Sequence, residues 1–167
     1  MTNTKLIMSV WTVMFMLTGS VLYAQQSHEE LAIVQNLFGM NKRSLYEKTM
    51  TLSAADSVGF WPLYDTYESK RTKAVKNTID ATKKFISVYP NTTHEQINDM
   101  IMDISDANDY LRDLILDYYS DIRKTTSAQT AAMFYQIESY ILNALELEIN
   151  NSLPFLQSYS LSLQKRK

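Results

Sequence analysis

The chain has 167 residues, with three glycines, three prolines and no cysteine, so it has the length of about one domain and few of the residues that turns require. Its hydrophobic content of 46% and charged content of 20% are typical of a folded protein and exclude wholesale disorder. The formal charge of −2 argues against a nucleic-acid partner, because such binding needs a positive surface. Because the chain has few of the residues that turns require, we expect an all-α protein.

The first 24 residues have the pattern of a signal peptide. Lys5 precedes the uncharged apolar stretch 6–22, and the small residue Ala24 stands directly before Gln25. This pattern predicts cleavage after Ala24 and a periplasmic or secreted protein that meets the membrane only during export. The alternative is an uncleaved membrane anchor, because roughly 17 apolar residues are near the lower limit for a span.

The remaining chain predicts a single helical domain over 25–160, followed by a basic tail over 161–167. We expect a first helix at about 29–51, in which Gly39 weakens the middle by about 1 kcal/mol. The second helix is expected at about 54–89. Ser53 is its predicted N-cap, with Asp56 three residues later in a variant of the capping box.

Two features shape the predicted second helix. Pro62 lies inside it and should kink it, because proline lacks an amide hydrogen and clashes with the preceding turn. Pro90 and the polar residues after it should end the helix. The short connection then leads directly into the next periodic segment.

The third helix is expected at about 94–124, opened by a capping box of Thr93 and Gln96. Its apolar positions alternate between spacings of four and three, which predicts a coiled-coil-like seam. The seam consists of Ile97, Ile101, Ile104, Asn108, Leu111, Ile115, Tyr118 and Ile122. The fourth helix is expected at about 127–152, with Thr126 as N-cap, Gln129 as its box partner and Pro154 beyond its end.

The second and third predicted helices are long and joined by a short connection, so we expect four helices in an elongated antiparallel helical hairpin architecture. Lysines over 70–84 and aspartates over 99–113 support this pairing: Lys84 should lie opposite Asp99, and Lys70 opposite Asp113. The alternative for these lysines is a phosphate or anionic-lipid site. A chain this thin should leave apolar surface uncovered, which predicts a homodimer.

The sequence does not favour an enzyme. It contains no HExxH, P-loop or GxSxG motif, and we attribute the carboxylates Glu138, Glu146 and Glu148 to solubility. Its two histidines, His28 and His94, lie in distant segments and are expected to be solvated. We therefore predict no catalytic residue, no cofactor and no metal site.

Two predicted helix starts share one pattern at an offset of 73 residues. Ser53 to Asp56 can be laid over Thr126 to Gln129, and Phe60 with Trp61 over Met133 with Phe134. Each copy combines a cap with aromatic side chains two turns later. The candidate interaction residues are Ser53, Asp56, Phe60, Trp61, Thr126, Gln129, Phe134, Tyr118 and Tyr119.

These segments carry a resemblance to a known family. The stretches 52–56 and 125–129 resemble the LTxxQ motifs at helix starts in the Spy/CpxP-like superfamily, and 60–65, 89–96, 134–138 and 152–155 look like an uncharacterised bacterial branch of it. The resemblance implies a periplasmic, all-helical and often dimeric protein. In that superfamily, members bind unfolded clients or sense envelope stress and metal.

Two functional hypotheses follow. The first is an exported, chaperone-like binding protein or envelope-stress adaptor that recognises flexible or unfolded polypeptide without ATP, through a surface containing aromatic and methionine side chains. The second is a structural or signalling dimer, metal-sensing in one form, that binds no client.

Overall fold

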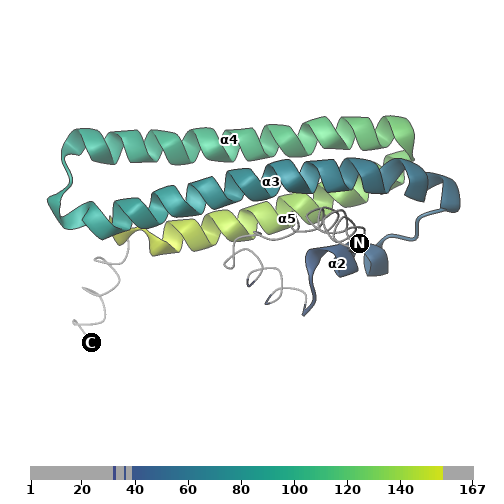
Figure 1. Ribbon diagram of the computed structural model, residues 1–167, viewed down its shortest axis with the longest axis horizontal. Helices are drawn as coiled ribbons and strands as arrows, with labels where there is room; N and C mark the ends of the chain where they lie inside the picture. The colour runs from purple at the N-terminus through teal and green to yellow at the C-terminus, as the bar shows by residue number, and fades with distance from the viewer. Residues whose placement is uncertain (1–31, 33–35, 37–38, 156–167) are drawn as a thin grey trace, which may run out of the picture.

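The computed structural model describes residues 32, 36 and 39–155, and this part of the chain is all-helical with no strand (Figure 1). It contains α2 (Lys42–Thr49), α3 (Ala54–Val88), the short 3₁₀ helix η1 (Tyr89–Asn91), α4 (His94–Thr125) and α5 (Ala128–Ser152). The all-α prediction is confirmed. The predicted signal peptide and basic tail lie outside the described residues.

The three long helices lie lengthwise beside one another, with α3 against α4 and α4 against α5 (Figure 1). Short α2 lies near one end of this layer, on the side away from α4 in the view of Figure 1. Its side chains reach both α3 and α5. This arrangement gives the molecule two interhelical faces: one between α3 and α4, and one between α3 and α5 beneath α2.

The first turns of α3 and α4 follow the predicted caps. The Ser53 hydroxyl oxygen accepts a hydrogen bond from the Asp56 amide at 3.0 Å, and the Ser53 hydroxyl donates to the Asp56 carboxylate at 2.9 Å. Thr93 and Gln96 form a complete reciprocal capping box. These bonds satisfy amides that no helical carbonyl can reach. Within α3, Pro62 is accommodated without ending the helix.

The predicted cap of α5 is wrong by one residue. Ser127 is the N-cap, and its side-chain oxygen accepts from the Thr130 amide at 3.0 Å. Thr126 instead ends α4, where its hydroxyl donates to the Ile122 carbonyl at 2.7 Å. Ser127 has the extended backbone that an N-cap needs, whereas Thr126 does not. Gln129 is exposed and takes no part in a capping box.

The corrected cap changes the register of the internal repeat. Ser53 and Ser127, the two N-caps, are 74 residues apart, not 73. With this offset, five buried positions of α3 coincide with five buried positions of α5. The pairs are Phe60 with Phe134, Tyr64 with Glu138, Tyr67 with Ile141, Arg71 with Leu145, and Val75 with Ile149. The repeat is therefore a repeat of inward-facing positions, and it places a carboxylate and a guanidinium in the interior.

The predicted first helix is not continuous. Gly39 has a φ of +68°, a left-handed conformation that glycine adopts without strain and that ends a helix. A new helix begins only after Asn41, whose side chain accepts from the Ser44 amide at 2.9 Å. The rest of the predicted segment before Gly39 lies largely outside the described residues.

Aromatic rings fill the core near α2. Rings from α2, α3 and α5 meet edge to face, with Tyr46 4.8 Å from Tyr64 and Tyr67 4.9 Å from Phe134 between centroids. On α4, the predicted seam is buried at Leu111, Ile115, Tyr118 and Ile122. It is wrong at Ile101, which is exposed, while neighbouring Met100 is buried. The buried stripe of α4 also includes Leu114, so it is wider than a two-helix seam because α4 packs on both α3 and α5.

Candidate functional site

A groove runs along the face between α3 and α4. It consists of two adjoining hollows of about 320 Å³ and 670 Å³, both lined by Thr78, Ala81 and Asp103. We call the two together the α3–α4 groove. Its shared lining contains short side chains on α3, which leave space between two helices that pack closely elsewhere.

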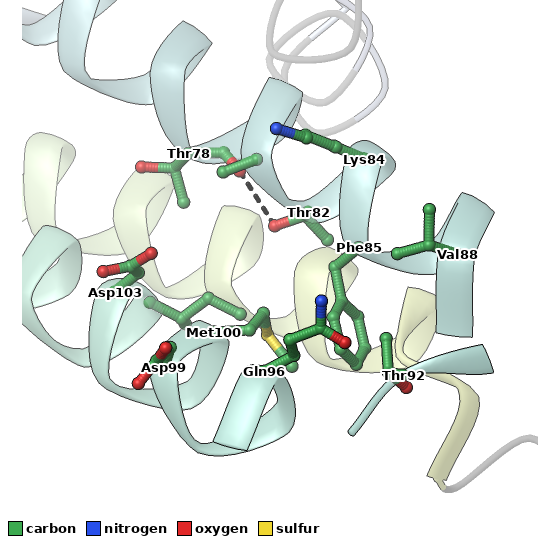
Figure 2. A pocket seen from close by; sticks show the side chains of 12 residues that line it. Thr78, Thr82, Lys84, Phe85, Val88, Thr92, Gln96, Asp99, Met100 and Asp103 are labelled. Carbon is green, nitrogen blue, oxygen red and sulfur yellow. Dashed lines mark hydrogen bonds between the residues drawn. The ribbon is translucent and has the colours of Figure 1, made fainter. Parts of the chain in front are cut away.

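The smaller hollow, at the η1 end, is the more apolar part of the α3–α4 groove. Figure 2 shows Phe85 from α3 and Met100 from α4 side by side in its lining, and the two belong to one packed cluster. Val88 lies on the same wall and is 46% exposed. The Thr82 hydroxyl in this lining donates to the Thr78 carbonyl of the same helix at 2.8 Å (Figure 2). Phe85 and Met100 are themselves buried, so Val88 is the exposed apolar side chain at this end.

Charges of opposite sign line the two walls of the α3–α4 groove. Lys70, Lys73 and Lys84 line it from α3, and Asp99 and Asp103 line it from α4. The side chain of Lys84 is directed away from Phe85 and Met100 (Figure 2). The walls are therefore available to charged groups of either sign.

The lysines and aspartates predicted to lie opposite one another across this face do not form ion pairs. Lys84 and Asp99 line the same hollow, yet among the described side chains no ion pair joins them, and none joins Lys70 to Asp113. The Lys70 ammonium instead lies 5.3 Å from the centroid of the Tyr118 ring. Exposed ion pairs gain little over solvated charges, whereas a lysine above an aromatic face also covers apolar surface.

A second unusual feature is a buried charge cluster beneath α2. Glu138 of α5 is fully buried, and its carboxylate lies 2.8 Å from Lys42 Nζ and 3.2 Å from Arg71 Nε. Lys42 also contacts Glu68 at 2.6 Å. We call these four residues the buried charge cluster. It joins three helices and contains two cations and two carboxylates, so it is electrically neutral.

Two tyrosines complete the coordination of Glu138. The Tyr46 hydroxyl donates to Oε1 at 2.5 Å and the Tyr67 hydroxyl donates to Oε2 at 2.8 Å. Both rings are fully buried. A buried carboxylate is tolerated only when its lone pairs are satisfied, and here two hydroxyls and two cations do so.

The surroundings fix the charge states of the buried charge cluster. Burial by itself would raise the pKa of Glu138, but attraction to Lys42 and then Arg71 outweighs it, so this pKa is lowered. Burial would likewise lower the pKa of Lys42, but Glu138 and Glu68 hold it above the usual value. Burial raises the pKa of Glu68, with Glu138 adding to the rise against the opposing pull of Lys42. Glu138 is therefore the more firmly ionised carboxylate.

The sequence interpretation of Glu138 as a solubilising carboxylate is wrong. The signal that identifies it is its position: Glu138 lies four residues after Phe134 and three before Ile141, on the buried stripe of α5. Lys42 and Tyr46, one turn apart on α2, were likewise missed as core residues, because their side chains are polar. A polar side chain inside an apolar period belongs to the interior when its partners lie on neighbouring helices.

None of the residues predicted as candidate interaction sites lines the α3–α4 groove, and several of them lie in helix caps or in the core. Phe60 and Phe134 are fully buried core rings, and Tyr118 is buried beneath Lys70. Trp61 is half-buried, with the Arg43 guanidinium 4.3 Å from its ring centroid. Tyr119 packs edge to face against Tyr135 of α5 with a centroid distance of 6.0 Å.

Two further findings concern metals and membranes. Among the residues that the structure describes, no three histidine, aspartate or glutamate side chains gather as metal ligands. None of the described helices has the length and apolar character needed to cross a membrane.

Comparison with known proteins gives no match, whether to a family model, a curated protein or a solved structure.

Proposed function

We propose that the protein is an exported helical binding protein that holds flexible or unfolded polypeptide in the α3–α4 groove without ATP. The observation that carries this proposal is the combination of an open groove, an apolar end and walls of opposite charge. Exposed Val88 supplies apolar contact beside the buried Phe85 and Met100, and lysines face aspartates across the gap. An extended segment with apolar side chains and charges of both signs fits this chemistry.

The binding mode follows from the composition of the walls. Lysines on α3 attract carboxylates of a client and aspartates on α4 attract its lysines, so neither sign dominates the approach. At the apolar end, the flexible side chain of Met100 can adjust to different side chains placed against Val88. We expect weak binding that depends only mildly on salt.

The proposal extends to the architecture and the family. The contacts of α3 with α4 across a short connection support an elongated antiparallel hairpin, and the caps at Ser53 and Thr93 are those of regular helix starts. We place the protein with the Spy/CpxP-like superfamily on the sequence resemblance alone. Periplasmic location, cleavage after Ala24 and a homodimer belong to the same proposal.

The second candidate is a structural or signalling dimer that binds no client. It is favoured by apolar side chains that are exposed outside the α3–α4 groove. Leu116 on α4 is 51% exposed and Leu147 on α5 is 62% exposed. If a second copy covers these side chains, light scattering will show a dimer and a polar substitution such as Leu147→Asp will weaken it.

The test fills the groove. Ala81 lines both hollows and is exposed, so Ala81→Trp should obstruct the groove without entering the core. Ala132 on α5 is exposed and outside the groove lining, so Ala132→Trp is the matched control. The assay is suppression of aggregation of a chemically unfolded model protein at near-equimolar ratio. We expect suppression by the wild type and by Ala132→Trp, and its loss in Ala81→Trp.

Equal suppression by both variants would remove the groove from the mechanism. No suppression by folded wild type at several-fold excess would reject client binding and leave the structural or signalling dimer. Circular dichroism and urea unfolding of each variant establish that the substituted proteins are folded.

A further inference from the structure

α2 lies in a second groove, between α3 and α5. Lys42 bridges Glu68 of α3 and Glu138 of α5, and Tyr46 donates to the same Glu138. Between these two residues, Leu45 packs against Ile141 of α5. In Figure 1, α2 lies along the side of this helix pair away from α4. One face of α2, with side chains at positions 42, 45 and 46, thus closes the core from this side.

The attachment of α2 depends on side chains. With eight residues, α2 is too short to be helical by itself in water, so its helical state depends on docking. It is bounded by Gly39 in the left-handed conformation and by the non-helical segment 50–53 before α3. The described backbone on both sides of α2 is outside any helix, so α2 is a separate helical unit, held in place by the buried side chains of Lys42 and Tyr46.

The surface beneath α2 has a defined chemistry. It presents the rings of Tyr64, Tyr67 and Phe134 around the carboxylates of Glu68 and Glu138. An aromatic groove with acidic groups at its centre recognises a cation attached to an apolar helix face. With α2 removed, Glu138 loses one of its two cations and one of its two hydroxyl donors.

We propose that the groove between α3 and α5 is a helix-binding surface, that α2 is its removable occupant, and that its external partner is an amphipathic helix with a lysine and a tyrosine one turn apart. The lysine of the partner takes the place of Lys42 between the two carboxylates. Its tyrosine hydroxyl donates to Glu138, and a leucine between them meets Ile141. This inference does not depend on the α3–α4 groove.

The test tethers α2 where it touches solvent. Arg43 of α2 and Asp65 of α3 form an exposed ion pair with 2.7 Å between Nη1 and Oδ1, so cysteines at these positions can be joined by a short thiol crosslinker. Because the chain has no native cysteine, the reaction is specific. The control is the same R43C/D65C protein with both thiols capped by a monofunctional reagent. The probe is a fluorescent peptide with the sequence of residues 39–53.

We expect the peptide to bind the capped protein and to bind the crosslinked protein at least tenfold more weakly. A peptide with Lys42→Glu and Tyr46→Ala should not bind the capped protein. Equal binding to both protein forms, or no binding to the capped form, would overturn the proposal.

Hydrogen exchange of the unmodified protein provides a second measurement that needs no substitution. We expect the amides of α2 to exchange at least 100-fold faster than the amide of Leu145 in α5, because α2 opens separately from the core. Exchange at one common rate would show that α2 opens only with global unfolding, and the proposal would be wrong.

Discussion

Replacing Glu138 with glutamine tests the buried charge cluster, because the new side chain keeps the size and loses only the charge. In the wild type, two cations and two carboxylates balance. In Glu138→Gln, Lys42 keeps Glu68, but Arg71 loses the carboxylate that lies 3.2 Å from its Nε. Breaking a buried pair by neutralising one partner costs about 3–5 kcal/mol, since the remaining buried charge loses a carboxylate partner.

The measurement is the free energy of unfolding from urea titration, with matched controls. Glu146→Gln removes a carboxylate from the same helix, but its partner Arg112 is 51% exposed, so the expected loss is about 0–1 kcal/mol. Adding Lys42→Met to Glu138→Gln leaves Glu68 and Arg71 and restores neutrality. The double variant should therefore be more stable than the sum of the single effects predicts, by about 1–3 kcal/mol.

The reasoning would be refuted if Glu138→Gln cost no more than Glu146→Gln, or if the two changes at Glu138 and Lys42 were additive. Either result would mean that other groups around Arg71, or a relaxed geometry, compensate its charge after the carboxylate is neutralised. The denaturant slope must be unchanged for the comparison to hold, because a change in slope reports a change in the surface exposed on unfolding.

Further predictions concern pH, helix caps and close packing. The pKa of Glu138 is lowered in the folded state. The ionised carboxylate therefore stabilises the fold fully above the unfolded-state pKa of about 4.3, and this stabilisation is lost as the pH falls through the folded-state pKa. The difference in unfolding free energy between Glu138→Gln and wild type should therefore shrink in urea titrations at acid pH. A constant difference would contradict this assignment. Ser127→Ala should lower the unfolding free energy by about 0.5–2 kcal/mol and Thr126→Ala by less, since only Ser127 caps α5. A larger loss in Thr126→Ala would instead support Thr126 as the N-cap of α5. Gly59→Ala should cost about 1–3 kcal/mol in thermal or urea unfolding, because its Cβ would lie 2.7 Å from the Thr125 carbonyl oxygen. A neutral result for Gly59→Ala would mean that the α4–α5 corner moves aside. In Gly39→Ala the new Cβ meets no atom within 4 Å, so this variant should cost only the left-handed backbone strain of about 1–2 kcal/mol.

Local signals in the sequence predict most of the helix boundaries. Ser53 and Thr93 are followed by Asp56 and Gln96, and such caps depend on residues close in the chain, so α3 and α4 begin where expected. At Thr126 and Ser127 two capping residues are adjacent, and the choice between them depends on how α4 ends. Sequence alone does not settle that competition.

The interior polar residues are harder to predict because their partners are distant in the chain. Glu138 is 92 residues from Tyr46 and 71 from Tyr67, and without knowledge of those contacts a glutamate on a helix is expected in solvent. The α3–α4 groove depends in the same way on Ala81 and Thr78, small residues whose effect appears only once two helices are packed.

Site-specific photocrosslinking tests the proposed function most directly. A photoreactive amino acid at Asn77, which is exposed and lines the larger hollow, should crosslink a fluorescent, reduced and carboxymethylated model protein. The same amino acid at Ala132, outside the groove lining, should not. Strong crosslinking from Asn77 alone is the result that polypeptide binding in the α3–α4 groove predicts. Equal crosslinking from both positions, or none from Asn77 in the folded protein, would contradict it.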